Sequence, residues 1–156
     1  MMTGHEVSWS VQAFHEMDAR LLHDVLRLRV DVFVVEQQCP YSELDGADPG
    51  ALHVVGRNPI GDVLAYARIL PPAQDGMPHV GRVVVAMAGR GHGIGRQLML
   101  EVLHALHVHY PGSPSALAAQ AHLEGFYSSL GYMATGQQYE LDGIPHINMV
   151  RASNQA

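Results

Sequence analysis

The sequence has 156 residues, of which 47% are hydrophobic and 15% charged, and its formal net charge at pH 7 is −6. This length suits one domain (residues 1–156) with a full core, and the composition excludes a disordered chain. No apolar run reaches the roughly 18 residues of a membrane span, and the acidic balance disfavours a nucleic-acid surface. The N-terminus carries no secretory signal pattern, so we expect a cytoplasmic protein.

Apolar periodicity predicts a strand and then a helix near the N-terminus. Residues 7–13 alternate between apolar and polar side chains, which is the period of a half-buried strand. From Asp18, a plausible helix cap, apolar residues recur every three or four positions to about Glu36. We therefore expect one amphipathic helix, with Arg27 and Arg29 as solvated or paired residues on its surface.

Most of the remaining chain reads as strands, in the segments 52–57, 63–70, 79–87, 115–120, 137–141 and 146–150. The first two should form an antiparallel hairpin, and the valine-rich third should be central and buried on both faces. Pro145 is expected to shorten the last strand. Helices are predicted from Ile94 to the residue before Pro111, and over 122–132 with a left-handed end at Gly131.

A glycine-rich turn, residues 89–96, links the valine-rich strand to the longer helix. Free amides at a helix start attract anions, and glycine lets a phosphate approach the main chain. A simple connection between strand and helix is the alternative. Arg96-Gln97 stands where a nucleoside-triphosphate loop needs Lys followed by Ser or Thr, and the alternate glycines do not fit a dinucleotide fingerprint. The remaining pattern is Arg-x-x-Gly-x-Gly, residues 90–95.

At these residues the chain resembles the GNAT acyltransferase superfamily, whose acetyl-CoA loop has this pattern. Further segments make the resemblance specific to the ElaA-type N-acetyltransferase branch: 29–37, 39–41, 45–46, 66–70, 81–85, 119–123, 126–127, 131–132 and 142–146. The resemblance covers roughly residues 20 to 151. It implies an α/β (α+β) fold, with a mixed, mostly antiparallel sheet of six to seven strands, splayed into a V and flanked by about four helices.

The resemblance also implies roles for individual residues. Acetyl-CoA would be the donor, with its pantetheine arm on the main chain of Val83, Val84 and Val85 and a main-chain N–H near Val85 polarising the thioester carbonyl. Its pyrophosphate would lie on the glycine loop, formed by Arg90, Gly91, His92, Gly93, Ile94, Gly95 and Arg96. Tyr127 matches the tyrosine that protonates the departing sulfur in many GNAT enzymes; the alternative is a tyrosine packed beside the cofactor.

The acceptor side is less defined by the sequence. The candidates for the base that deprotonates the amine are Glu36, Asp45, Asp48, His122, Glu140 and His146. His122 and His146 rank first because histidine ordinarily titrates near neutral pH, although each could instead bind substrate or serve the structure. The residues expected to contact the acceptor are Glu36, Cys39, Tyr41, Arg68, His122, Glu140 and His146.

Two other chemistries are disfavoured. Cys39 is the single cysteine, and without a neighbouring histidine it reads better as a half-buried thiol than as a nucleophile. His104, His107 and His109 lack a carboxylate at metal-binding spacing, so no metal is predicted.

The sequence therefore predicts an acetyl-CoA-dependent N-acetyltransferase that acts on a primary amine of a small molecule or peptide through a ternary complex. The alternative is a non-catalytic sensor or interaction module that binds acyl-CoA without turning it over. We expect no nucleic-acid or membrane partner, and a homodimer is left open.

Overall fold

The computed structural model describes residues 6–153, which form an eight-stranded sheet with the order β1-β2-β3-β4-β5-β8-β6, and β7 pairs with β8. The strands are β1 (Ser8–Ala13), β2 (Leu52–Arg57), β3 (Val63–Leu70), β4 (His79–Val85), β5 (Ser115–Gln120), β6 (Met133–Ala134), β7 (Tyr139–Leu141) and β8 (Ile144–Arg151). Among the described strands, only the β4–β5 pair is parallel. The predicted mixed, mostly antiparallel sheet is confirmed, with the short β6 as an additional strand.

Three α-helices accompany the sheet: α1 (Ala19–Arg29), α2 (Ile94–His109) and α3 (Glu124–Ser128). Short 3₁₀ turns lie at Phe14–Glu16, Asp48–Gly50, Met87–Gly89 and Ala121–Leu123. The predicted start of the first helix is confirmed, because the Asp18 side chain accepts a hydrogen bond from the Leu21 amide at 2.7 Å. Gly131 has the expected left-handed conformation, with φ of +96°.

The first helix differs from the prediction in its second part, because Val30–Glu36 is a π-helix. The amides of Gln37 and Cys39 bond to carbonyls five residues earlier, those of Val32 and Val34. Four of the seven residues in this segment are valines, whose branched side chains crowd a tight α-helical turn. Since π-turns are rare and concentrate at functional sites, the segment marks a place to look for one.

Helices α1 and α2 cover opposite faces of the sheet formed by β1–β4. On β3, Tyr66 packs with the apolar side of α1, whereas Ala65 and Ala67 belong to the cluster that contains α2. This alternation follows from the period of two in a strand. Side chains such as Leu98 and Val102 are fully buried there, and each contributes about 1.5–3 kcal/mol.

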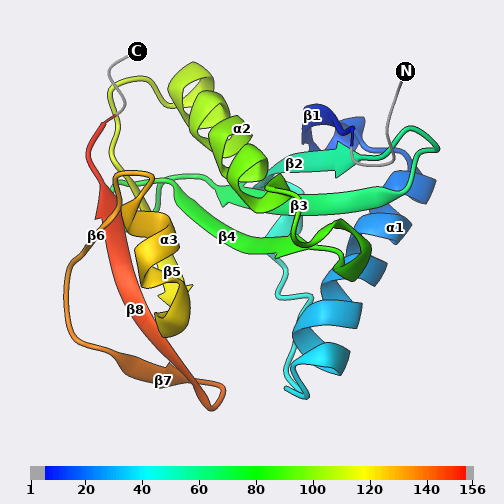
Figure 1. Cartoon of the computed structure of the whole chain (residues 1–156). Helices are drawn as coiled ribbons and strands as arrows, with labels where there is room; N and C mark the ends of the chain where they lie inside the picture. Colours follow the sequence, from blue (N-terminus) through cyan, green and yellow to red (C-terminus); the bar gives the residue numbers. More distant parts are fainter. Residues whose placement is uncertain (1–5, 154–156) are drawn as a thin grey trace.

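The sheet opens between β4 and β5 (Figure 1), which pair at only two positions, His79 with Ala116 and Val80 with Leu117. Just beyond, one residue of β3, Ala67, lies opposite two residues of β4, Arg82 and Val83. This bulge, in which Arg82 has a φ of +53°, bends β4 away from β5. The predicted V-shaped splay therefore has a local backbone cause.

Three details of the prediction are wrong. Arg29 is fully buried rather than on the surface, because carboxylates from other segments surround it. The valine strand is not buried on both faces, since Val83 and Val85 line a cleft. Pro145 does not shorten β8, which begins at Ile144, because the β5 ladder starts only at His146 and needs no Pro145 amide.

Within the described residues, no helix is long and apolar enough to span a membrane.

Candidate functional site

A cleft of about 630 Å³ lies where β4 and β5 part. It brings together many of the predicted site residues: Glu36, Cys39, Tyr41, Val83, Val84, Val85, Arg90, Gly95, His122, Tyr127 and His146. They come from the π-helix, the loop after it, β4, the glycine loop, α3 with its preceding turn, and β8. Residues more than 100 positions apart in the chain thus face one space.

The edge of β4 offers main-chain groups to this cleft. The amide of Ala86 donates to the Leu64 carbonyl at 2.7 Å, so that amide points toward β3. Because successive residues of a strand point their polar groups to opposite sides, the N–H and C=O of Val85 point away from β3, to the side from which β5 has withdrawn. An extended chain with amide groups could pair with this edge.

The glycine loop leads into α2 at Gly93, so the amides of the first helical turn begin at Ile94. Gly91 and Gly93 have φ of +84° and +73°, a region that glycine enters without steric cost. Gly93 is the cap of the 16-residue helix and supplies no side-chain hydrogen bond to its first turn. The loop therefore has a backbone geometry that suits an anion, and its role as the pyrophosphate site stays a prediction.

Arg90 binds groups of both β4 and the π-helix, while its side chain remains partly exposed. Its Nη1 and Nη2 donate to Glu36 Oε2 and Oε1, each at 2.9 Å, and its Nε donates to the Val85 carbonyl at 3.1 Å. The hydrogen bond from Arg90 lowers the pKa of Glu36. The pair therefore joins the π-helix to the glycine loop.

Tyr127 reaches the cleft from α3 and is 5% exposed. Its ring meets that of Tyr132 edge-on, with the centroids 6.2 Å apart. Burial raises the pKa of Tyr127 to about 12, so the phenol stays protonated at neutral pH. A protonated phenol in an apolar wall can donate a proton or a hydrogen bond.

His122 and His146 also line the cleft, and they differ in how their imidazole rings are held in place. His146 Nδ1 lies 2.7 Å from the Ile144 carbonyl, which can only accept, so the neutral ring carries its hydrogen on Nδ1 and leaves Nε2 as an acceptor. The ring also stacks on Tyr139, at 6.2 Å between centroids. His122 lies on an exposed 3₁₀ turn.

Behind the cleft, six charged side chains form a closed ring that sequence reasoning missed. Going around it, the contacts are Arg29–Glu43 at 2.7 Å, Glu43–Arg82 at 2.8 Å, Arg82–Asp45 at 3.4 Å, Asp45–Arg68 at 2.6 Å, Arg68–Asp48 at 3.1 Å and Asp48–Arg29 at 2.8 Å. We call these residues the charge ring. Signs alternate around it, so its formal charge is zero, and it fixes the loop 37–50 to α1, β3 and β4.

Electrostatics within the charge ring remove two base candidates. The hydrogen bond from Arg68 holds the pKa of Asp45 far below its usual value. Burial opposes ionisation of Asp48, yet Arg29 and Arg68 keep its pKa lowered. Such weak bases cannot take a proton from an amine at neutral pH.

The charge ring also fixes the position of Tyr41, a residue of the cleft wall. Tyr41 donates a hydrogen bond to Glu43, and its aromatic ring lies under the Arg82 guanidinium at 5.7 Å. Burial and the bond to Glu43 raise the pKa of Tyr41. Its hydroxyl is therefore a fixed, neutral donor directed at the loop.

Several predicted residues are not among those that line the cleft. Arg68 is 3% exposed and its guanidinium is held by Asp45 and Asp48, while Glu140 lies exposed on β7. Of the residues predicted to form the glycine loop, only Arg90 and Gly95 line the cleft. Arg96 instead donates to the Ser129 hydroxyl at 3.4 Å.

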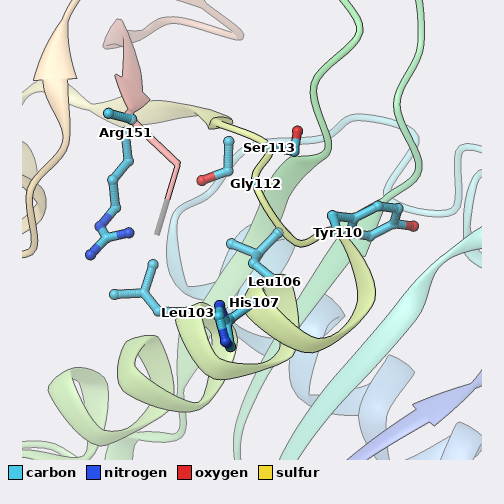
Figure 2. A pocket seen from close by; sticks show the side chains of 9 residues that line it. Leu103, Leu106, His107, Tyr110, Gly112, Ser113 and Arg151 are labelled. Carbon is cyan, nitrogen blue, oxygen red and sulfur yellow. The ribbon is translucent and has the colours of Figure 1, made fainter. Parts of the chain in front are cut away.

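A second cavity lies between the end of α2 and the end of β8 (Figure 2), with His107 and Leu103 on the helix and Arg151 opposite. Its volume of about 10 Å³ is that of a single water molecule. The buried Nδ1 of His107 lacks a protein partner, so a water there would satisfy it. This space is too small for a substrate.

Comparison with known proteins shows which family the chain belongs to. Residues 28–153 match the family model described as an acetyltransferase (GNAT) domain. The chain belongs to the GNAT family. Protein ElaA of Escherichia coli is 44% identical over 154 residues, covering 96% of this chain and 99% of that protein.

Solved structures agree with this assignment. A structure described as an acyl-CoA N-acyltransferase from Pseudomonas aeruginosa has a TM-score of 0.90 and 40% identity, covering 94% of this chain and 100% of that one. The crystal structure of Escherichia coli ElaA has a TM-score of 0.88 and 41% identity, covering 94% and 99%. The predicted ElaA-type GNAT acyltransferase is therefore confirmed as the family and the fold.

Proposed function

We propose that this GNAT protein is an acetyl-CoA-dependent N-acetyltransferase that passes the acetyl group directly to a primary amine of a small molecule or peptide. The observation that supports this most strongly is the parting of β4 from β5 beside the glycine loop. It leaves the polar groups of Val85 facing a cleft that ends at the free amides of α2. This arrangement suits a long donor with amide groups and a pyrophosphate.

Acetyl-CoA supplies an acetyl thioester when bound. The Val85 N–H would stabilise the negative charge that develops on the carbonyl oxygen. Tyr127 holds its proton at neutral pH and would give it to the sulfur as the carbon–sulfur bond breaks, while the carbon–nitrogen bond forms. A base must accept the proton that the amine loses, which balances the transfer.

We assign the base to His146 rather than to His122. The bond from His146 Nδ1 to the Ile144 carbonyl leaves Nε2 with its lone pair, and the ring lies at the cleft wall. His122 also lines the cleft, but it lies on an exposed turn. Exchange of His146 for Gln should lower kcat at saturating acetyl-CoA, whereas exchange of His122 for Gln should leave it nearly unchanged.

Direct transfer needs the donor and the acceptor in the cleft together. Its volume of about 630 Å³ falls within the range of roughly 300–1,000 Å³ that is usual for small-ligand sites. Cys39, the residue that could form an acyl-enzyme, donates from Sγ to the Asp142 carbonyl at 3.4 Å and is buried. We therefore favour a ternary complex, and extend the proposal to a cytoplasmic protein of one domain.

The test is release of free CoA from acetyl-CoA in the presence of a panel of primary amines, followed with a thiol reagent. We expect amine-dependent release, and intact-mass measurement without amine should show no acetylated protein. Binding of acetyl-CoA without any release above background hydrolysis would make the protein an acyl-CoA sensor. An acetylated Cys39 would replace direct transfer by a covalent route.

A further inference from the structure

The ion pair between Arg90 and Glu36 lies at the cleft that we propose for transfer. Both headgroups line it, and both remain partly exposed, with side-chain exposures of 40% and 36%. All three of the Arg90 hydrogen bonds go to groups of the cleft, two to Glu36 and one to the Val85 carbonyl. Arg90 therefore covers an acidic side chain and a strand-edge acceptor at once.

The position of Arg90 in the chain gives it a second partner. It directly precedes the residues whose amides form the anion site at the start of α2. A half-exposed ion pair is screened by water and therefore weak, whereas a diphosphate offers more charge and several acceptor oxygens. A phosphate-bearing ligand on the loop would compete with Glu36 for the same guanidinium.

The charge of the cleft would change if the Arg90 side chain turned away from Glu36. The charged residues that line it are Glu36, Arg82, Arg90 and Asp142. Arg82 stays compensated by Glu43 and Asp45 of the charge ring. Once Arg90 turns to a phosphate, the wall near the π-helix keeps the uncompensated carboxylate of Glu36, a group suited to a cation.

We propose that Glu36 is the carboxylate that selects a cationic amine as acceptor, and that Arg90 masks it until the diphosphate of the donor draws Arg90 away. This inference rests on the proposed function and names its acceptor class and its binding order. Donor binding uncovers the acceptor site, so donor and acceptor bind cooperatively, donor first. The π-helix is the element that brings the Glu36 carboxylate to the cleft.

The first test is the affinity of the purified protein for CoA, measured by calorimetry for the wild type and Glu36→Gln. Removal of the competitor should tighten CoA binding about threefold, at the upper range of an exposed ion pair. If Glu36 instead orients Arg90 for the phosphate, the variant binds CoA more weakly. Unchanged or weaker binding overturns the masking.

Two controls separate competition from general charge. Asp31→Asn removes an exposed carboxylate from the same π-helix, outside the cleft, and should leave the CoA affinity within measurement error. Pantetheine lacks the diphosphate, so its affinity should rise less than that of CoA in Glu36→Gln. An equal gain in Asp31→Asn, or for pantetheine, overturns the proposed exchange of partners.

The second test concerns the acceptor and uses benzylamine, a primary amine that is cationic at neutral pH, with uncharged benzyl alcohol as its match. Saturating CoA should tighten benzylamine binding by up to about threefold in the wild type, because the same masking equilibrium governs both ligands, and leave benzyl alcohol unaffected. Glu36→Gln should lose this coupling. Absence of coupling, or equal coupling for both probes, overturns the role of Glu36.

These binding tests need no turnover, so they are separate from the proposed function. Amine-dependent release of CoA together with an unchanged Glu36→Gln variant would retain the transferase and reject the masking. Failure of the protein to bind CoA would instead reject the proposed function, and the inference with it.

Discussion

The two halves of the cleft are built from different parts of the polypeptide. The glycine-loop half, formed by the β4 edge and residues 89–96, presents main-chain amides and carbonyls. The charge-ring half, formed by loop 37–50 and the six charged residues behind it, presents side chains fixed by buried ion pairs. The first suits the phosphate-bearing donor that we propose, and the second can vary its surface side chains while the buried ion pairs keep its backbone fixed.

The two halves of the cleft also differ in how they respond to substitutions. Main-chain groups keep their chemistry after most substitutions, and only a changed backbone conformation alters them. A buried ring of charges depends on every member, because removing one leaves its neighbours uncompensated in a poorly solvated place. Substitutions in the ring should therefore affect stability, and substitutions in the loop should affect binding.

The largest expected effect comes from Glu43→Gln. Glu43 is 4% exposed and accepts hydrogen bonds from Arg29, Arg82 and Tyr41. Removing its charge should lower the free energy of unfolding by about 3–5 kcal/mol, as for other buried ion pairs that lose a partner. Urea unfolding measures this change.

The matched control is Glu140→Gln, the same chemical change on exposed β7, which should alter stability by about 0.5 kcal/mol or less. Equal, small effects of both variants would mean that the ring contributes no more than surface charges. The contrast between the two halves would then not hold.

The same contrast explains what could be predicted from the sequence. The glycine-loop half is local: Arg90, Gly93 and Gly95 lie within six positions, between a strand and a helix that their own periodicity reveals. The strands 52–57, 63–70 and 115–120 were predicted with the observed bounds, the first two because turn residues separate them and the third because a strand fits between two helices. Local patterns thus sufficed to place the glycine loop and most of the sheet.

The charge ring could not be predicted from such patterns, because its members come from positions 29 to 82 and only the folded sheet brings them together. One signal was present: Arg29 follows Val25 by four residues and so lies on the apolar side of α1. An arginine there requires a buried counter-charge, which the carboxylate-rich loop supplies. The bulge at Arg82 left no such signal, since its φ of +53° is imposed by tertiary contacts.

The second largest effect tests the proposed chemistry of the cleft. Tyr127→Phe keeps the ring that packs against Tyr132 and removes only the hydroxyl. The rate constant kcat should fall about 100-fold, the lower range for loss of a general acid, with the affinity for acetyl-CoA unchanged. Steady-state kinetics with an amine from the panel give both values. Full turnover would reduce Tyr127 to a packing residue.

A smaller effect is expected in the glycine-loop half. An alanine side chain at Gly93 would meet no atom within 4 Å, so the cost of Gly93→Ala arises from its φ of +73° alone. This cost is about 1 kcal/mol, which corresponds to roughly fivefold weaker binding if it falls on the CoA complex. Calorimetry with CoA measures the loss.

Gly50→Ala provides the comparison, because Gly50 also has open space around it but no positive φ. Its CoA affinity should stay unchanged. Comparable losses in both variants would show that the left-handed conformation of the loop is not what prepares the anion site.

The smallest expected effect concerns His53, a buried histidine beside the charge ring, and its contribution to the pH dependence of stability. His53 is 1% exposed; its Nε2 donates to the Asp48 carbonyl at 3.0 Å, so its Nδ1 accepts from the Tyr66 hydroxyl at 2.6 Å. Burial lowers the pKa of His53, so the folded protein keeps the ring neutral where the unfolded chain, with a histidine pKa of about 6.5, takes up a proton. Stability should therefore fall as the pH decreases through this value, by at most about 0.7 kcal/mol between pH 7 and pH 6.

His53→Gln isolates this contribution, because an amide can still donate to the Asp48 carbonyl but does not titrate. Urea midpoints of the variant should lose less with acidification than those of the wild type, while the other histidines titrate equally in both. Parallel curves would mean that His53 protonates as easily in the folded protein as in the unfolded chain. The hydrogen bonds of His53 would then add nothing to the stability of the charge ring, which would depend on its ion pairs alone.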